Sequence, residues 1–177
     1  MNIENINGLF LYKNYISDEY HNDLINFIND QPWNVSLSRR TQHYGYIYDY
    51  SKKSKPQSTI AIPEIFLQLK TNIESLPMIN NIKFDQCIIN EYFPGQGISP
   101  HVDHTTQFGP IVVSLSLASP CTFQFIRNNM VLNYKLEPKE LCIMTEDARY
   151  FYKHSIPKTK SDRTGIRYSI TFRSIKD

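Results

Sequence analysis

The strongest constraint on the fold is a change of hydrophobic pattern near the middle of the chain. In the first 80 residues, apolar side chains recur at helical spacing, as in the stripe that runs from Tyr20 through Leu24 to Ile28. From Ile82 onward, short segments alternate apolar and polar residues, which is the period of a β-strand. Helices followed by a run of strands predict an α+β chain in which a double-stranded β-helix, or jelly roll, is supported by N-terminal helices.

The helix boundaries are indicated by their first residues. Ser17 is a good N-cap, and the two acidic residues that follow it suit the positive end of a helix dipole. Pro63 is expected to open a second helix. We expect a strand over residues 8–15 ahead of the first helix, and polar loops over residues 51–58 and 158–165.

Length and composition indicate one domain. We treat residues 1–177 as a single domain, with helical support and a lid in residues 1–80 and a jelly-roll core in residues 81–177. The three cysteines are an odd number without metal-site spacing, so we expect buried thiols in an intracellular protein, in the cytoplasm or nucleus. No apolar run is long enough to cross a membrane. The net charge of +2 only weakly favours a polyanionic partner, and we expect a monomer.

A His-x-Asp pair and a distant histidine form a candidate metal site. His101 and Asp103 are two residues apart, so in an extended chain both side chains point to the same side. His154 follows 51 residues after Asp103, which leaves room for several strands between them. Two imidazoles and one carboxylate can hold one face of a ferrous ion and leave positions open for reactants. His104 would face away from Asp103 and is not chosen. Taken alone, a His-x-Asp pair is more often an accident of a polar surface.

A pair of arginines would supply what an acidic co-substrate beside that metal needs. Residues 167–173 alternate cleanly, which predicts a strand with one apolar face, and Arg167 and Arg173 fall on its polar face. Guanidinium groups bind carboxylates in a bidentate fork. Without the metal motif, a solvated basic face on an edge strand would be the better interpretation.

Asn90 and Tyr92 share one face of a second predicted strand. From a neighbouring strand they could donate hydrogen bonds to the same dianion. Taken alone, they would be ordinary polar strand residues.

Together these elements resemble the AlkB family of Fe(II)/2-oxoglutarate-dependent dioxygenases. The matching segments are residues 88–103, 111–119, 141–156 and 167–173, and their motifs follow in the family's order. The resemblance implies a jelly-roll oxygenase that uses Fe(II), 2-oxoglutarate and O₂.

The resemblance also assigns roles to residues. The iron ligands would be His101, Asp103 and His154, which are the catalytic centre. The 2-oxoglutarate would be bound by Asn90, Tyr92, Arg167 and Arg173. Arg167 would pair with the distal carboxylate, and Arg173 would lie near the end of the molecule that chelates the metal.

Residues 39–48 are the best clue to the substrate. They interleave basic, aromatic and glycine residues. Arginine can bind phosphate, and aromatic rings can stack on an extruded base. An amphipathic strand whose tyrosines pack on the core is the alternative. In the AlkB family this region belongs to a nucleotide-recognition lid, and its pattern here is similar to the branch that hydroxylates a modified wobble uridine in tRNA. The candidate substrate-binding residues are Arg39, Arg40, Tyr44, Tyr46 and Arg149.

Two features bear on the reaction. Repair demethylases of the family often carry a second acidic residue two positions after the ligand aspartate, where this chain has Thr105. For Arg149, a structural ion pair is an alternative to a role in the substrate pocket. We expect oxidation of an alkyl group on a nucleobase in nucleic acid, with RNA or tRNA favoured over DNA, as RNA modification or as oxidative dealkylation. The alternative is a protein or small-molecule 2-oxoglutarate-dependent hydroxylase on the same fold, because the motif is common to both.

Overall fold

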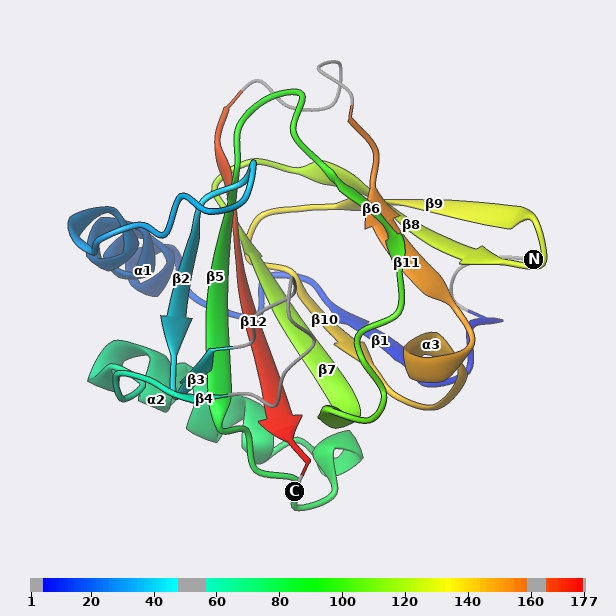
Figure 1. Cartoon of the computed structure of the whole chain (residues 1–177), viewed down its shortest axis with the longest axis horizontal. Coiled ribbons are helices and arrows are strands. Elements are labelled where there is room, and N and C mark those ends of the chain that lie inside the picture. Colours follow the sequence, from blue (N-terminus) through cyan, green and yellow to red (C-terminus); the bar gives the residue numbers. More distant parts are fainter. Residues whose placement is uncertain (1–4, 48–56, 159–164, 177) are drawn as a thin grey trace.

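Two β-sheets pack face to face, with helices on the outer side of the larger one (Figure 1). The computed structural model describes residues 5–47, 57–158 and 165–176. The major sheet has the strand order β1-β10-β7-β12-β5-β2, and the minor sheet has the order β6-β11-β8-β9. A short ribbon of β3 and β4 adjoins them. The predicted α+β jelly-roll class is confirmed.

The bounds of the elements follow from their hydrogen bonding. The strands of the major sheet are β1 (Leu9–Tyr12), β10 (Leu141–Met144), β7 (Phe108–Leu117), β12 (Arg167–Ile175), β5 (Gln86–Tyr92) and β2 (Thr41–Tyr44). Those of the minor sheet are β6 (Ile98–His101), β11 (Lys153–Ile156), β8 (Cys121–Arg127) and β9 (Met130–Leu136). The remaining elements are β3 (Tyr46–Ile47), β4 (Gln57–Ser58), α1 (Asp18–Asp30), α2 (Glu64–Glu74), the 3₁₀ helix Pro77–Ile79 and α3 (Glu146–Tyr150).

Strand β12 lies in the interior of the major sheet. It pairs antiparallel with β5 on one side and with β7 on the other, over most of its length. The interpretation of its two arginines as a solvated face on an edge strand is therefore wrong. Because side chains alternate across a strand, β12 turns its apolar residues toward the helices and its polar residues toward the minor sheet.

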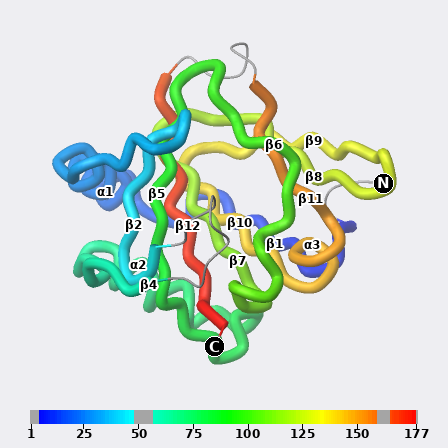
Figure 2. The backbone as a smooth tube through the Cα atoms, viewed as in Figure 1, coloured from blue at the N-terminus to red at the C-terminus, as the bar shows by residue number. Residues whose placement is uncertain are grey.

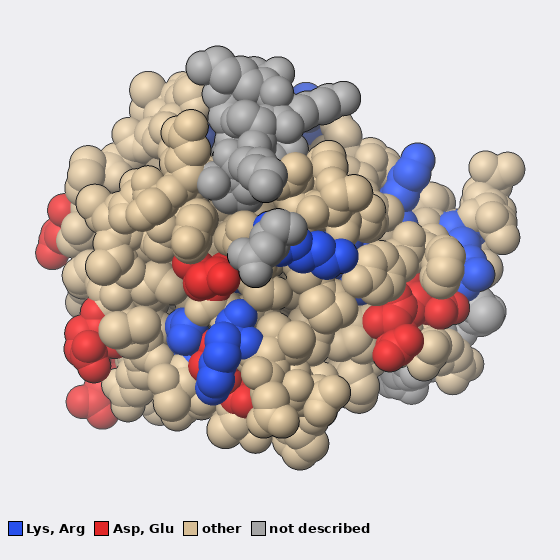
Figure 3. All heavy atoms as spheres, turned by 60° about the horizontal axis from the view of Figure 1, so that its bottom comes forward, with Lys and Arg blue, Asp and Glu red and all other residues tan. Residues whose placement is uncertain are grey.

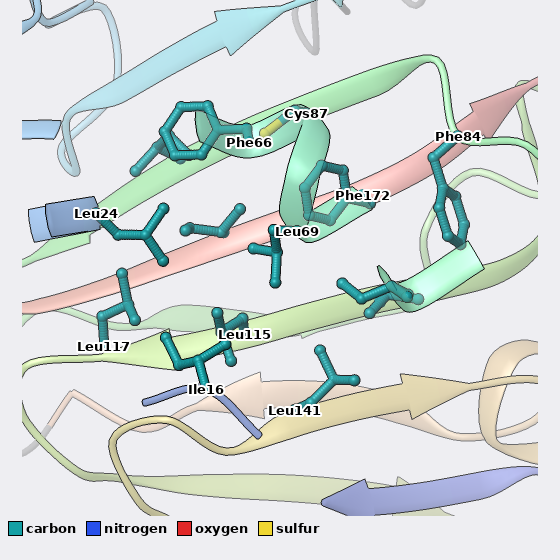
Figure 4. Packing of buried hydrophobic residues seen from close by; sticks show 14 of the residues in the cluster. Ile16, Leu24, Phe66, Leu69, Phe84, Cys87, Leu115, Leu117, Leu141 and Phe172 are labelled. Atoms are coloured by element: carbon teal, nitrogen blue, oxygen red, sulfur yellow. The ribbon is translucent and has the colours of Figure 1, made fainter. Parts of the chain in front are cut away.

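The larger hydrophobic core lies between the helices and the outer face of the major sheet. Figure 4 shows Leu24 of α1 and Leu69 of α2 over Leu115 of β7 and Phe172 of β12, and all four side chains are fully buried. As predicted, Ser17 caps α1, where its hydroxyl accepts a hydrogen bond from the Tyr20 backbone N–H at 3.1 Å.

A second hydrophobic core lies between the two sheets. It is built from the other parity of the same strands, as with Val112 of β7 and Met144 of β10, against Phe123 and Ile156 of the minor sheet. Figure 2 shows how the chain leaves the major sheet after β5, crosses to the minor sheet as β6 and returns as β7. Residues of β5 and β7 in the major sheet therefore face residues of β6 in the minor sheet across the space between the sheets.

The first 80 residues are more than helical support, because they also supply β1 and β2 to the major sheet. Of the two expected loops, residues 51–56 and 159–164 lie outside the described residues, as does Tyr48, and residues 57–58 form β4. The three cysteines are buried free thiols, as predicted. Within the described parts of the chain, none of the helices is both long and apolar enough to cross a bilayer.

The helix-to-sheet core predicts a large effect of truncation. Replacing Ile73, which is fully buried in α2, by alanine removes packed methyl groups and leaves a cavity, so Ile73→Ala should lower the free energy of unfolding by about 2–5 kcal/mol in urea titrations. The matched variant Ile60→Ala, at a residue 63% exposed, should change it by less than about 0.5 kcal/mol. Equal effects of the two variants would contradict this packing.

Candidate active site

The inner faces of β5 and β12 form one wall of a polar cavity between the sheets. Asn90 lies directly opposite Ser169, and Tyr92 lies opposite Arg167, so these side chains point to the same side. The predicted alternation of both strands is therefore observed. The cavity is lined by Arg39, Ile88, Asn90, Tyr92, Ile98, His101, Asp103, Val112, Ser114, Phe123, Met144, His154, Ile156, Arg167, Ser169, Thr171 and Arg173.

The minor sheet brings the three candidate metal ligands together. His101 of β6 lies directly opposite His154 of β11, and Asp103 follows two residues after His101. One ligand atom from each of the three residues lies within 4.8 Å of the others. The Nδ1 atom of His101 lies 2.8 Å from the Ser99 carbonyl, which can accept its proton and so leave Nε2 free to bind a metal. His104 is exposed and is not part of this cluster.

Electrostatics favour the protonation states that a metal needs. Burial lowers the pKa of His154 to about 4, so the ring is neutral at pH 7 and has a lone pair to donate. Burial acts to raise the pKa of Asp103, but the positive charge of Arg173 and a hydrogen bond from His101 outweigh burial and hold that pKa well below its usual range. A set of two imidazoles and one carboxylate fits a divalent iron ion with open coordination positions.

Arg167 fits an organic dicarboxylate at the far end of the cavity. It is 1% exposed, its Nε donates to the Ser116 hydroxyl at 3.0 Å, and its guanidinium lies over the Tyr92 ring. Its Nη1 and Nη2 atoms are buried and have no hydrogen-bond partner among the described residues. A buried, unsatisfied guanidinium is unfavourable unless a ligand completes it, and a carboxylate would do so with two parallel hydrogen bonds.

Arg173 lies at the metal end of the same cavity. Its Nη1 atom is 3.5 Å from an Asp103 oxygen, its Nε donates to Gln86 at 2.8 Å, and its guanidinium lies 3.9 Å from the centre of the Phe108 ring. The two arginines are thus at opposite ends of one cavity, where one anionic molecule could contact both. Sequence reasoning missed Ser116 and Gln86, although their inward parity on β7 and β5 was a signal that could have found them.

The candidate substrate residues are only partly brought to the cavity. Arg39 lines it, and its Nε donates to the Asn90 amide oxygen at 2.9 Å. Arg40 is turned away and makes a bidentate ion pair with Glu91, which is 1% exposed, while stacking on Trp33. Arg40 therefore neutralises the buried carboxylate of Glu91.

The two tyrosines also lie outside the cavity lining. Tyr44 is 3% exposed, packs in the helix-to-sheet core and donates to Gln42, so it has no surface to offer a substrate. Tyr46 is partly buried on β3. Thr41 and His43 are on the cavity side of β2, opposite Asn90 and Ile88. Burial together with the charges of Arg173 and Arg39 lowers the pKa of His43 to about 4.

Arg149 is 2% exposed, and its hydrogen bonds to described residues all go to backbone carbonyls, so neither a substrate contact nor an ion pair describes it. Among the described residues, no ion pair includes it.

A groove on the surface also reaches two of the candidate metal ligands. Its walls are residues 37–39, residues 97–99, Val102, His104 and Lys158, and its floor includes His101 and Asp103. The inner cavity and the outer groove therefore share the two ligands together with Arg39 and Ile98. A molecule in the groove would approach the same metal as a co-substrate in the cavity.

Comparisons with known proteins agree with this geometry. Residues 26–173 match the model of the 2OG-Fe(II) oxygenase superfamily. This chain belongs to that superfamily. It is therefore a dioxygenase that depends on Fe(II) and 2-oxoglutarate, with O₂ as the oxidant, and the residues of the cavity fit both groups.

Individual relatives narrow the resemblance. The chain is 33% identical to a mimivirus protein named uncharacterized protein L905, over 97% of this chain and 87% of that protein. It is 28% identical to mouse tRNA (carboxymethyluridine(34)-5-O)-methyltransferase ALKBH8, over 96% of this chain but only 30% of that protein. The solved structure of OsALKBH1 has the same fold, with a TM-score of 0.75, 17% identity and coverage of 94% of this chain and 96% of that one. The resemblance to the AlkB family is confirmed.

The ligand assignment can be tested by replacing two different histidines, one inside the cluster and one outside it. His154→Ala removes one of three metal ligands, so it should weaken Co(II) binding at least about 100-fold and abolish succinate formation. His104→Ala removes a histidine that lies next to Asp103 but outside the cluster, and it should bind Co(II) as the unaltered chain does. Both can be measured by optical titration with Co(II). Retained metal affinity in His154→Ala would remove His154 from the site.

Proposed function

We propose that this chain oxidises an alkyl carbon on a nucleobase, with RNA or tRNA favoured over DNA. His101, Asp103 and His154 would hold Fe(II), and Asn90, Tyr92, Arg167 and Arg173 would hold 2-oxoglutarate. Bound together, these groups supply oxidation of a carbon by O₂ with decarboxylation of 2-oxoglutarate to succinate. The observation that carries the proposal is the buried guanidinium of Arg167, with two unsatisfied donors facing the cavity that contains the metal ligands.

The residues of the chain bind and orient the reactants. Arg167 and Arg173 would fix the two ends of the co-substrate, because their guanidinium groups lie at opposite ends of the cavity. The groove would admit the base to the residues that would hold the metal, since His101 and Asp103 line it. The apolar side chains of Ile98 and Phe123 beside the ligands would keep water from that part of the site.

The charge of the groove supports a neutral or anionic base over a cationic one. Arg39 and Lys158 line the groove, and among the described residues Asp103, whose carboxylate would be engaged by the metal, is its one acidic lining residue. Adenine alkylated at N1 and cytosine alkylated at N3 carry a positive charge, which this lining would repel. A uridine with a carbon-linked substituent carries no positive charge. Its hydroxylated product would be stable, because the hydroxylated carbon is not bonded to nitrogen and so cannot be released.

The rest of the surface offers less to a polyanion. On the face shown in Figure 3, basic and acidic side chains are interspersed, with no broad basic area. Attraction of RNA would then depend on the groove, where Lys158 lies.

We further propose that the protein is a monomer. We also propose that it acts inside the cell, in the cytoplasm or nucleus, and the buried free thiols support this location.

A panel of nucleic acids tests the proposal. The Fe(II)-loaded chain would be given total tRNA, synthetic RNA with carbon-substituted uridines, and RNA and DNA with N1-methyladenine or N3-methylcytosine, and products would be read by nucleoside mass spectrometry. Hydroxylated uridines, with little loss of methyl groups from cationic bases, are the expected result. Succinate formation with peptides or amino acids and with none of the nucleic acids would instead support the protein or small-molecule hydroxylase.

Charge reversal can show where nucleic acid binds. Arg40 is unsuitable, because its loss would leave the buried Glu91 unpaired and disturb folding. Lys158→Glu, on the rim of the groove, should weaken RNA binding and reduce the salt dependence of the dissociation constant by about one unit or more. Lys153→Glu is the matched control, on an exposed residue of β11 outside the groove, and it should leave RNA binding unchanged. Equal weakening by both would mean that RNA binding does not depend on the groove.

A further inference from the structure

Asp103 differs from the other two candidate ligands in how its backbone is held. His101 and His154 lie in paired strands, where ladder hydrogen bonds fix their main chain. Asp103 lies beyond the end of β6, in the segment 102–107 that leads to β7, and belongs to no strand. A metal ligand in a loop needs some other restraint if its carboxylate is to keep a fixed direction.

The guanidinium of Arg149 supplies that restraint from the opposite side of the chain. Its Nη1 atom donates to the main-chain carbonyl of Asp103 at 2.9 Å. Its Nε donates to the Gly109 carbonyl at 3.2 Å, and its Nη2 lies 3.5 Å from the Phe108 carbonyl. One planar group therefore fastens both ends of the loop, at the ligand and at the start of β7.

The position of Arg149 along the chain adds to this effect. It belongs to α3, the short helix that leads directly into β11, where His154 lies. The hydrogen bond to Asp103 spans 46 residues of sequence and joins the segments that carry two of the three ligands. The distance between those ligands would then be set before any metal binds.

The burial of Arg149 indicates a specific role. It is 2% exposed, and the hydrogen bonds of its guanidinium go to neutral carbonyls. A buried cation without an ion pair is unfavourable for folding, and an apolar residue of similar volume is often as good or better for stability. Packing alone would therefore not require an arginine here.

We propose that Arg149 is a positioning residue for the metal ligand Asp103, which it holds in place through the carbonyl of that residue and those of Phe108 and Gly109. It touches neither cavity nor groove and acts only through the loop. The proposal rests on the assignment of Asp103 as a ligand, made above. Loss of this hydrogen bond should weaken the metal site more than it weakens the fold.

Arg149→Met is the direct test, in the full chain without added 2-oxoglutarate. Titration with Co(II) should show binding about 10- to 100-fold weaker than in the unaltered chain, which is the usual effect of removing a group that orients a ligand. The visible spectrum of the Co(II) complex should change with it, because the carboxylate no longer holds one direction. Methylguanidine added to Arg149→Ala should restore part of the Co(II) affinity.

Arg127→Met is the matched control. Arg127 is also an arginine that contacts α3, through an ion pair with Asp147 at 2.9 Å, but it has no contact with the loop of Asp103. Its loss should leave Co(II) affinity and spectrum unchanged. If Arg127→Met weakens Co(II) binding as much as Arg149→Met, general support by α3 explains the effect and the proposal is overturned.

The outcomes separate this proposal from the ligand assignment. If the unaltered chain binds no Co(II), or Asp103→Ala binds it as tightly as the unaltered chain, the ligand assignment fails and the positioning role fails with it. If the ligands are confirmed and Arg149→Met binds Co(II) with unchanged affinity and spectrum, the positioning role alone is wrong. Should Arg149→Met fail to fold, Arg149→Lys takes its place, since it keeps the charge but cannot span three carbonyls. Its Co(II) affinity should be reduced at least about 3-fold, and unchanged affinity would overturn the proposal.

Discussion

The site depends on a buried positive charge, that of Arg167, which makes no ion pair within the described parts of the chain. Arg167 lies on an interior strand of the major sheet, its Nε donates to the Ser116 hydroxyl, and its guanidinium lies over the Tyr92 ring. Its Nη1 and Nη2 atoms have no hydrogen-bond partner among the described residues, and its side chain lines the polar cavity. Leaving such donors unsatisfied costs about 1–3 kcal/mol or more, which the rest of the core must offset. A dicarboxylate that enters the cavity recovers that free energy as binding, with little rearrangement of the side chain.

The two sheets supply different parts of the candidate site. The major sheet would supply the groups that bind the co-substrate, because every second residue pair of β5 and β12 turns its side chains toward the cavity. The minor sheet supplies both imidazoles through a single antiparallel pairing of His101 with His154. Asp103 is the one candidate ligand outside a strand, and this explains why a buried arginine is found beneath its loop. The groove then gives a second molecule access to the same centre.

Much of this arrangement was predictable from the sequence, since alternation fixes which residues share a face. The polar face of residues 167–173 and the shared face of Asn90 and Tyr92 follow from the period of a strand. The closeness of Asp103 to His101 was also expected, although Asp103 lies just beyond the end of β6. Which face is the inner one does not follow. For residues 39–44, only pairing with β5 shows that Tyr44 enters the hydrophobic core while Arg39 lies at the cavity. Polar contacts between distant segments could not be predicted from the sequence either. Arg40 and Glu91 are 51 residues apart. The partners of Arg149 are backbone carbonyls, which leave no pattern in the sequence.

The most direct test of the account is the affinity for 2-oxoglutarate of the Mn(II)-loaded chain and of its Arg167→Met variant, measured by calorimetry. Two charge-assisted hydrogen bonds would be lost, so binding should weaken by about 100-fold, while Mn(II) affinity stays the same. The free energy of unfolding without ligands should stay equal or rise, because an unsatisfied buried charge has been removed. If the variant bound 2-oxoglutarate as tightly as the unaltered chain, the cavity between the sheets would not be its site.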